Sequence, residues 1–196
     1  MDVALIASEC IDTRIRGEVP RVMCKLDIEK AFDHLNWSFL LNTLRQMRFG
    51  RRLIKWIEFC IKTTRFSILI NGEPAGFFLA ERGLRQGDPL SPFLFIIAME
   101  GLGSMMRRAT TNNWIKGFNI KDRNNEIMEV THLLCADDTV VFCEVKQEQI
   151  CYLRVILVIF EAFSRLKINW RKSNIFLVKE VQQIQSLADI LRCKTE

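Results

Sequence analysis

The chain has 196 residues, of which 49% are apolar and 26% charged, a balance that suits one soluble globular domain and excludes a disordered or fibrous protein. Its formal net charge of +5 is compatible with a polyanionic partner without requiring one. No apolar run reaches the roughly 20 residues of a bilayer span, and the first residues lack a secretory pattern. The seven cysteines are scattered singly. We therefore expect an intracellular protein of the nucleus or cytoplasm, not secreted and without membrane contact.

The first third of the chain predicts helices around one buried strand. Residues 1–16 have the pattern of a helix, and residues 22–28 form an apolar run typical of a buried strand. Asn36 then caps a helix whose apolar residues recur every 3.6 positions and which we expect to end at Gly50. The next helix is predicted to turn four apolar residues inward: Leu53, Ile57, Cys60 and Ile61.

The middle of the chain predicts a hairpin and a long helix. Residues 66–71 alternate in polarity, and an Asn-Gly turn separates them from the apolar run 77–80, which is typical of a β-hairpin. Ser91 as the cap and Pro92 at the first helical position open a helix that runs to about Thr111.

The last third predicts two adjacent strands followed by a helix, a strand and a helix. After a turn over residues 122–125, the β-branched runs 130–135 and 139–145 predict strands joined by a short connection. A helix is expected around residues 150–163 and a strand at 174–178, with a final helix behind it.

The order of these elements indicates the fold class. Without its insertions it is strand, helices, hairpin, helix, strand, which is the α+β arrangement of the ferredoxin-like split β-α-β fold. No repeat or linker-like segment divides the chain, so we expect one domain over residues 1–196. Many functions share this topology, and the function must be argued from particular residues.

Acidic residues stand at two structurally defined places. Asp27 ends an apolar strand, and Asp137 and Asp138 lie between two hydrophobic strands. Like charges this close disfavour each other's ionisation unless a cation binds them, and Mg²⁺ binds carboxylates and phosphates together. Two such ions can support in-line phosphoryl chemistry if the two strands lie side by side. On its own, an Asp-Asp pair is more often a solvated turn.

Between the acids lies a glycine-rich loop that leads into the long helix. Residues 82–92 place Gly83 and Gly87 where backbone can approach a ligand closely, and the helix start offers free amides to an anion. In isolation this is an ordinary loop with a helix start.

Taken together, four segments resemble a known family. KLDIEKAFDHLNW, RGLRQGDPLSPFLF, CADDTVVF and FSRLKINWRKS are similar to motifs A, B, C and D of the reverse transcriptases of LINE-type (non-LTR) retrotransposons, plant members included. The segments occur in the family's order, and the resemblance runs from about Asp2 to Cys193.

The resemblance implies a role for each matching residue. Asp27 and Asp137 match the metal-binding acids, Asp138 the supporting acid, and the carbonyl of Ile28 a further metal ligand. Phe32 matches the residue that stacks under the sugar and rejects a 2′-hydroxyl. The other matching residues are Gln86 and Gly87, at positions that contact the nucleotide and template, and Lys172, at the position of the lysine near the leaving pyrophosphate.

Two positions depart from the family pattern. Cys135 stands where an aromatic residue usually precedes Ala-Asp-Asp, which affects packing against the primer end. Arg165 replaces the glycine of a Ser-Gly-Leu-Lys-Ile-Asn segment, which would strain a turn that needs a positive φ.

The family resemblance also implies the surroundings of the site. We expect a polymerase palm with additional helices, residues 1–21 as a fingers-side helix, and fingers and thumb largely missing. The implied cofactor is Mg²⁺, as two ions that Mn²⁺ could replace. The implied partners are an RNA template, a DNA primer and deoxynucleoside triphosphates.

Three functional readings stay open from the sequence. The first is an RNA-directed DNA polymerase core, and the second is an inactive truncated remnant with weak nucleic-acid binding. The third, a palm-like nucleotide cyclase, is disfavoured because the Gln86-Gly87 loop suits a templated polymerase. A basic stretch from Arg45 to Arg65 suits either a solvated helix face or a nucleic-acid surface.

Overall fold

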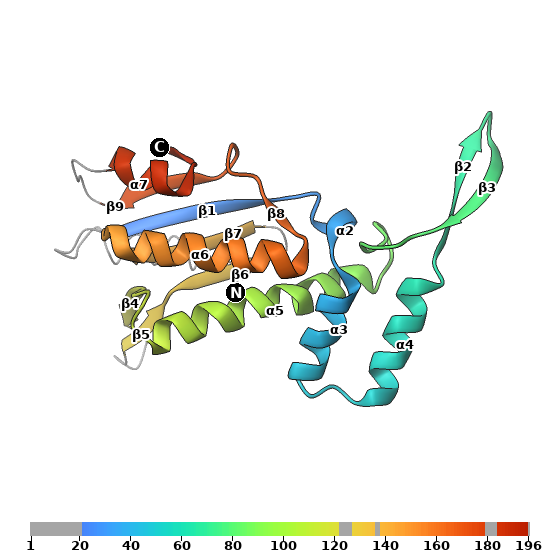
Figure 1. Ribbon diagram of the computed structural model, residues 1–196, viewed down its shortest axis with the longest axis horizontal. Coiled ribbons are helices and arrows are strands. Elements are labelled where there is room, and N and C mark those ends of the chain that lie inside the picture. Colours follow the sequence, from blue (N-terminus) through green and yellow to red (C-terminus); the bar gives the residue numbers. More distant parts are fainter. Residues whose placement is uncertain (1–20, 122–126, 136–137, 179–183, 196) are drawn as a thin grey trace.

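The computed structural model describes residues 21–121, 127–135, 138–178 and 184–195. Its centre is a sheet in the order β10-β9-β1-β7-β6, with the short β8 also paired to β1 (Figure 1). The strands of this sheet are β1 (Arg21–Glu29), β6 (His132–Cys135), β7 (Asp138–Glu144), β8 (Lys167–Ile168), β9 (Asn174–Val178) and β10 (Lys194–Thr195). The helix expected over residues 1–16 and the turn over 122–125 lie outside the described residues.

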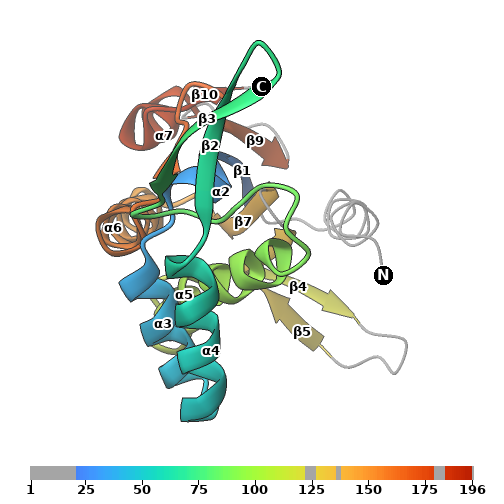
Figure 2. The ribbon, with the colours of Figure 1, turned by 90° about the vertical axis from the view of Figure 1, so that its right-hand side faces the viewer.

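Helices cover one face of the sheet. Figures 1 and 2 show α5 (Ser91–Thr111) and α6 (Gln147–Ser164) side by side on that face, with α7 (Ile184–Leu191) next to α6. The core strands and helices follow each other as β1, α5, β6, β7, α6, β9, and their sheet order is β9-β1-β7-β6. This is the ferredoxin-like split β-α-β arrangement, so the predicted α+β palm-like class is confirmed.

The segment between β1 and α5 extends away from the sheet. It holds α2 (Ala31–His34), α3 (Trp37–Gln46) and α4 (Arg51–Lys62), followed by the hairpin of β2 (Arg65–Ile70) and β3 (Glu73–Leu79). In Figure 1 this hairpin projects from the end of α4, beyond the rest of the molecule. A second hairpin, of β4 (Phe118–Lys121) and β5 (Ile127–Val130), is separate from the β2–β3 hairpin and lies at the lower right in Figure 2.

Alternation along β1 decides which side chains face the helices. Val22, Cys24, Leu26 and Ile28 are buried in the main core against α5 and α6, as a strand with one covered face requires. The intervening residues Met23, Lys25 and Asp27 therefore point to the opposite face, which none of the described helices covers. Met23 packs there in a second apolar cluster with Phe118 and Phe142.

The predicted helix boundaries are confirmed in part. Asn36 caps α3, because its side-chain oxygen accepts a hydrogen bond from the Ser38 amide at 2.9 Å. The prediction that Gly50 ends this helix is wrong: α3 ends at Gln46, and Gly50 is instead the N-cap of α4. Arg48, with a φ of 61°, supplies the left-handed residue between them.

Two other local predictions are wrong. On α4 the buried residues are Ile54, Ile57 and Ile61, whereas Leu53 and Cys60 are exposed. Ser91 does not cap α5, since it is buried within the first turn and the N-cap is Leu90, whose side chain cannot accept a hydrogen bond.

Arg165 occupies the position for which the sequence raised a question of strain. It follows the last residue of α6 with a φ of 63°, and its amide donates to the carbonyl of Glu161. The turn therefore does require the left-handed conformation that glycine adopts most readily.

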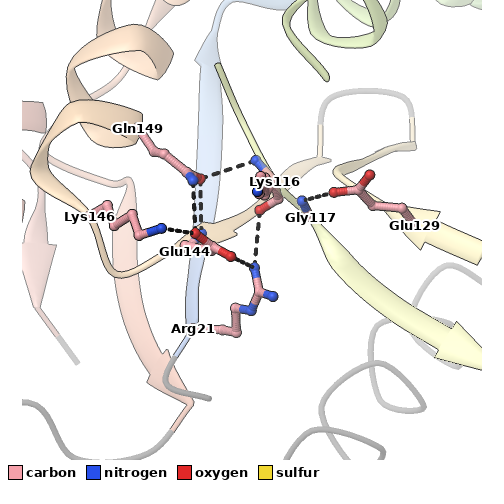
Figure 3. Close-up of polar contacts among 7 residues, drawn as sticks. All are labelled: Arg21, Lys116, Gly117, Glu129, Glu144, Lys146 and Gln149. Atoms are coloured by element: carbon pink, nitrogen blue, oxygen red, sulfur yellow. Dashed lines mark hydrogen bonds and ion pairs between the residues drawn. The ribbon is translucent and has the colours of Figure 1, made fainter. Parts of the chain in front are cut away.

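A polar network closes the end of the sheet where β1 begins (Figure 3). Arg21 pairs with Glu144 at 3.2 Å, and Glu144 also pairs with Lys146 at 2.8 Å. The buried Gln149 of α6 donates to Glu144 and accepts from the amide of Lys116. These contacts tie β1, β7, α6 and the segment before β4 together.

The charges in this network act on Glu144. Burial disfavours its ionised form, but the hydrogen bond from Lys146 and the charges of Arg21, Lys146 and Lys116 outweigh burial and lower the pKa of the carboxyl. Ionised Glu144 is therefore part of the folded structure at neutral pH.

Candidate active site

Two acids from distant parts of the chain meet on the open face of the sheet. In the antiparallel pairing of β1 with β7, Asp27 lies directly opposite Asp138. Directly opposed residues of an antiparallel pair project to the same face, with Cβ atoms about 5 Å apart. The strand-end acid and one of the hairpin acids are thus neighbours, whereas Asp137 lies outside the described residues.

A lysine accompanies the two acids. Lys25 forms an ion pair with Asp138 at 3.5 Å, and the two side chains are 54% and 66% exposed. Lys25 sits two residues before Asp27 on the same strand face. Because both partners are exposed, the pair is weak and a competing cation can displace the lysine.

The backbone of Asp27 is fixed by the segment resembling motif D. Its amide donates to Ser173 Oγ at 3.1 Å, and its carbonyl accepts from the amide of Asn169 at 2.8 Å. Ser173 Oγ also donates to the carbonyl of Asn169, which closes the turn. This turn carries the exposed Lys172, so the structure places its backbone beside the end of β1.

The glycine-rich loop docks on the turn that follows β1. The Gly83 amide donates to the Leu35 carbonyl at 2.8 Å, and Trp37 Nε1 donates to the Gly83 carbonyl at 2.6 Å. Gly83 has a φ of 79°, and a Cβ added there would lie 2.5 Å from the carbonyl oxygen of Asp33. Only glycine fits this contact without displacing backbone.

The next residues of the loop extend over the same turn. Gln86 Nε2 donates to Asp33 Oδ1 at 3.2 Å, so the Gln86 side chain is held against α2, which follows β1 and Asp27 in the chain. Gly87 has a φ of 83° with open space around it, which suits close approach by another molecule. Asp88 accepts from the Leu90 amide at 2.8 Å and leads the loop into α5.

Phe32 and Ile28 are placed by packing. Phe32 is half-buried, with its ring 5.2 Å from that of Phe95 on α5, and its carbonyl accepts from the Leu84 amide. Ile28 is buried in the main core and pairs with Ile168 of β8. Both residues lie close to Asp27 in the chain and are held by contacts with α5 and β8.

A cavity of about 560 Å³ opens beside the loop. Gln86 and Asp33 lie in its wall together with Arg82 and Arg85, and the β2–β3 hairpin contributes Phe66 and Phe78. Two arginines, a carboxamide and aromatic rings around one hollow suit an anionic ligand with a planar part.

Residues 8–188 match the family of reverse transcriptases (RNA-dependent DNA polymerases). The chain belongs to this family. Among curated relatives, an uncharacterized mitochondrial protein of Arabidopsis thaliana is 46% identical over 71 residues, covering 36% of this chain and 56% of that protein. The uncharacterized 149 kDa protein of transposon TX1 from Xenopus laevis is 28% identical over 153 residues, covering 76% of this chain and 11% of that protein.

Other relatives are retrotransposon proteins. The Pol polyprotein of a type-1 retrotransposable element R2 from Nasonia vitripennis is 28% identical over 122 residues, covering 62% of this chain and 11% of that protein. The chain thus spans about half of the Arabidopsis protein and about a ninth of the two retroelement proteins.

Solved telomerase structures share the fold. The telomerase of Candida albicans, solved with a fragment of telomeric RNA, superposes with a TM-score of 0.66 at 13% identity, covering 93% of this chain and 32% of that one. Apo telomerase from Candida tropicalis, truncated from its C-terminal domain, gives a TM-score of 0.63 at 12% identity, covering 92% and 36%. At this identity the likeness concerns the fold alone.

Sequence reasoning missed several residues that this candidate site contains. Asp33 holds Gln86, Ser173 holds Asp27, and Lys25 pairs with Asp138. Asp33 and Lys25 lie within the segment resembling motif A, so their proximity to Asp27 was a usable signal. Nothing in the spacing pointed to Ser173, because its role depends on a contact 146 positions away.

Among the described residues, no three His, Cys, Asp or Glu side chains form a group that could hold a metal ion by themselves. None of the described helices combines the length and hydrophobicity needed to cross a membrane.

Proposed function

We propose that this chain carries the polymerase centre of an RNA-directed DNA polymerase that adds deoxynucleotides to a primer 3′-hydroxyl during retrotransposition. The observation that carries the proposal is the direct pairing of Asp27 with Asp138 on the open face of the sheet. A cation bound between two neighbouring carboxylates relieves their repulsion, and Lys25 already forms an ion pair with Asp138.

The donor set fits Mg²⁺. Asp27 and Asp138 offer carboxylate oxygens on one face of the sheet, and the Ile28 carbonyl is one residue from Asp27. Asp137 lies outside the described residues and would join this set by its match to motif C. Two ions held there, Mg²⁺ or Mn²⁺, would activate the attacking hydroxyl and stabilise the leaving oxygen. The competing pair between Lys25 and Asp138 is exposed, so cation binding needs no change in the core.

Other residues of the chain would hold the nucleotide. Gln86, fixed by Asp33, and Gly87, with open space around it, would contact the deoxynucleoside triphosphate and the RNA template. Phe32 would lie under the sugar, and Lys172 would donate a proton or hydrogen bond to the pyrophosphate. Positioning by such groups supplies most of the catalysis in phosphoryl transfer.

The experiment that tests this function is primer extension. Residues 1–196 replace the equivalent segment of a full-length R2 Pol polyprotein, and extension of a DNA primer on an RNA template is followed with Mg²⁺. Asp27→Asn and Asp137→Asn should each lower the rate at least about a hundredfold. Asp189→Asn, on the exposed side of α7, is the matched control and should leave the rate unchanged.

The same assay tests Phe32. In the chimera, Phe32→Ala should increase ribonucleotide incorporation relative to deoxyribonucleotide, because the bulk that excludes the 2′-hydroxyl is lost. An unchanged ratio would remove Phe32 from the proposed site, and full activity of Asp137→Asn would refute the metal site itself.

A further inference from the structure

The outer face of α4 carries an unusual set of side chains. Ile54, Ile57 and Ile61 point into the core, and at 100° per residue the opposite face belongs to four other residues. We call them the α4 ridge: Arg52, Lys55, Trp56 and Phe59. All four are exposed, with Trp56 at 57% and Phe59 at 68%.

The aromatic residues of the α4 ridge distinguish it from an ordinary solvated helix face. Such a face needs only polar side chains, whereas two large rings one turn apart expose apolar area to water. The Arg52 guanidinium lies 4.9 Å from the centroid of the Trp56 ring, so a cation already covers part of that ring. The ridge thus alternates cations with planar apolar surfaces.

The surrounding segment is strongly basic. Residues 36–72 contain seven lysines and arginines and a single acid, Glu58, a net charge of 7 − 1 = +6. Glu58 pairs with Lys62 at 2.6 Å. Among the described residues, no carboxylate forms an ion pair with Arg52 or Lys55. A partner for this surface must therefore bring negative charge.

A hollow of about 520 Å³ lies beside the α4 ridge, between α3 and α4. Its wall contains three cations and one acid among six residues: Arg45, Phe49, Arg51, Ile54, Lys55 and Glu58. Lys55 belongs to both features, so the hollow and the ridge are continuous. Figure 1 shows α4 at the edge of the molecule, away from the sheet, where an extended chain has access.

We propose that the α4 ridge and this hollow bind single-stranded RNA. Bases would stack on Trp56 and Phe59, while phosphates would contact Arg52, Lys55 and the cations of the hollow. A duplex hides its base faces, so stacking selects a single strand. A second copy of this chain would bring the same excess of positive charge to the contact, which disfavours self-association through this face.

The choice of RNA over DNA rests on the proposed function, because an RNA template would then be present. Binding itself requires no polymerase activity. In the R2 chimera, Asp27→Asn should lower primer extension at least about a hundredfold. In the 196-residue chain the same variant should leave RNA binding unchanged, so failure of one proposal is distinguishable from failure of the other.

The first test measures RNA affinity by fluorescence anisotropy, with the full chain and a labelled single-stranded RNA of mixed sequence. Trp56→Ala and Phe59→Ala should each weaken binding about fivefold or more, as expected for the loss of a base-stacking ring. Phe163→Ala, which removes a 62% exposed ring from α6, is the matched control and should leave affinity unchanged. Thermal unfolding followed by circular dichroism checks that each variant is folded.

The second test measures the salt dependence of the same binding. Arg52→Gln should reduce the slope of log affinity against log salt by about 0.7, the value for one phosphate contact on a single strand. Arg108→Gln removes an equally exposed arginine near the end of α5 and should leave the slope unchanged.

Several results would overturn the proposal. These are unchanged RNA affinity in both aromatic variants, an equal loss for duplex RNA of the same length, or a loss confined to single-stranded DNA. Sedimentation that shows a dimer dissociated by Trp56→Ala would assign the ridge to a second copy of the chain, and would equally overturn RNA binding.

Discussion

Arg165 has a backbone conformation that disfavours a side chain. A non-glycine residue in the left-handed region costs about 1 kcal/mol, and Arg165 has a φ of 63° at the end of α6. Arg165→Gly should therefore raise stability by roughly 0.5–1 kcal/mol and the Tm by about 2 °C, measured by thermal unfolding. Arg165→Ala keeps the strain and should give no gain; equal gains from both variants would contradict the explanation.

Single residues differ in how far the sequence predicts them. The cap at Asn36 and the strain at Arg165 were predicted because both depend on local backbone geometry. The end of α3 was predicted wrongly at Gly50, because Arg48 takes the left-handed position that a glycine usually fills. The left-handed residue at Arg165 was expected because the family pattern has a glycine at that position, whereas no pattern marked Arg48.

The loop between β3 and α5 depends on Gly83. Alanine there would add a Cβ 2.5 Å from the Asp33 carbonyl oxygen, in addition to the cost of a φ of 79°. Gly83→Ala should lower the free energy of unfolding by about 3 kcal/mol, measured with urea. Gly72→Ala also has a positive φ, 87°, but meets nothing within 4 Å, so it should cost only about 1 kcal/mol. Equal losses in the free energy of unfolding for the two variants would mean that the close contact of Gly83 with Asp33 does not contribute to the effect.

The network at the start of β1 should make stability depend on pH. Because the pKa of Glu144 is lowered from 4.5, its stabilising effect is complete above that value and is lost as the pH falls through the folded-state pKa. Glu144→Gln should cost on the order of 2 kcal/mol at pH 7, and the difference from wild type should shrink at lower pH.

Urea unfolding at pH 7 and in the acid range measures this difference for Glu144→Gln. Glu73→Gln, in the exposed β2–β3 hairpin, is the control and should change stability less. A difference between Glu144→Gln and wild type that stays constant with pH would argue against the ionised network.

Elements show where sequence periodicity stops being informative. The existence of α3, α5, α6 and the β2–β3 hairpin was predicted, because each has a clear period or turn. The inner face of α4 was misassigned, because apolar residues occur on most sides of that helix. The two wrongly assigned residues, Leu53 and Cys60, are apolar and adjoin the buried face of α4, so periodicity alone does not separate them from it.

At the scale of the whole molecule, the exposure of the candidate site has a functional consequence. The Asp138 side chain is 66% exposed and that of Lys25 is 54% exposed, so among the described residues nothing encloses Asp138. Phosphoryl transfer needs a held primer and a clamped triphosphate as well as acids. We predict that the 196-residue chain alone does not extend a primer processively, whereas the R2 chimera does.

Gel analysis of product lengths on a primed RNA template tests this prediction. Robust extension by the short chain, abolished by Asp137→Asn, would contradict it. Inactivity of both proteins would instead favour the reading as an inactive remnant.

The sequence predicted the acids of the site but not their partners. The predicted pair was Asp27 with Asp137, which lies outside the described residues, and its neighbour Asp138 is the acid found opposite Asp27, 138 − 27 = 111 positions away. The contacts of Ser173, Asp33 and Lys25 depend on how three separate segments fold against one another. Periodicity carries no information about such contacts between segments.

The pairing of Asp27 with Asp138 also limits where the gene can tolerate insertions and deletions. Side chains alternate along a strand, so inserting or deleting one residue within β1 or β7 would send Asp27 and Asp138 to opposite faces. The exposed tip of the β2–β3 hairpin has no such constraint and can grow or shrink freely. In a lineage of drifting copies, single-codon insertions and deletions would accumulate at that tip, whereas a codon gained or lost in β1 or β7 would separate the two acids.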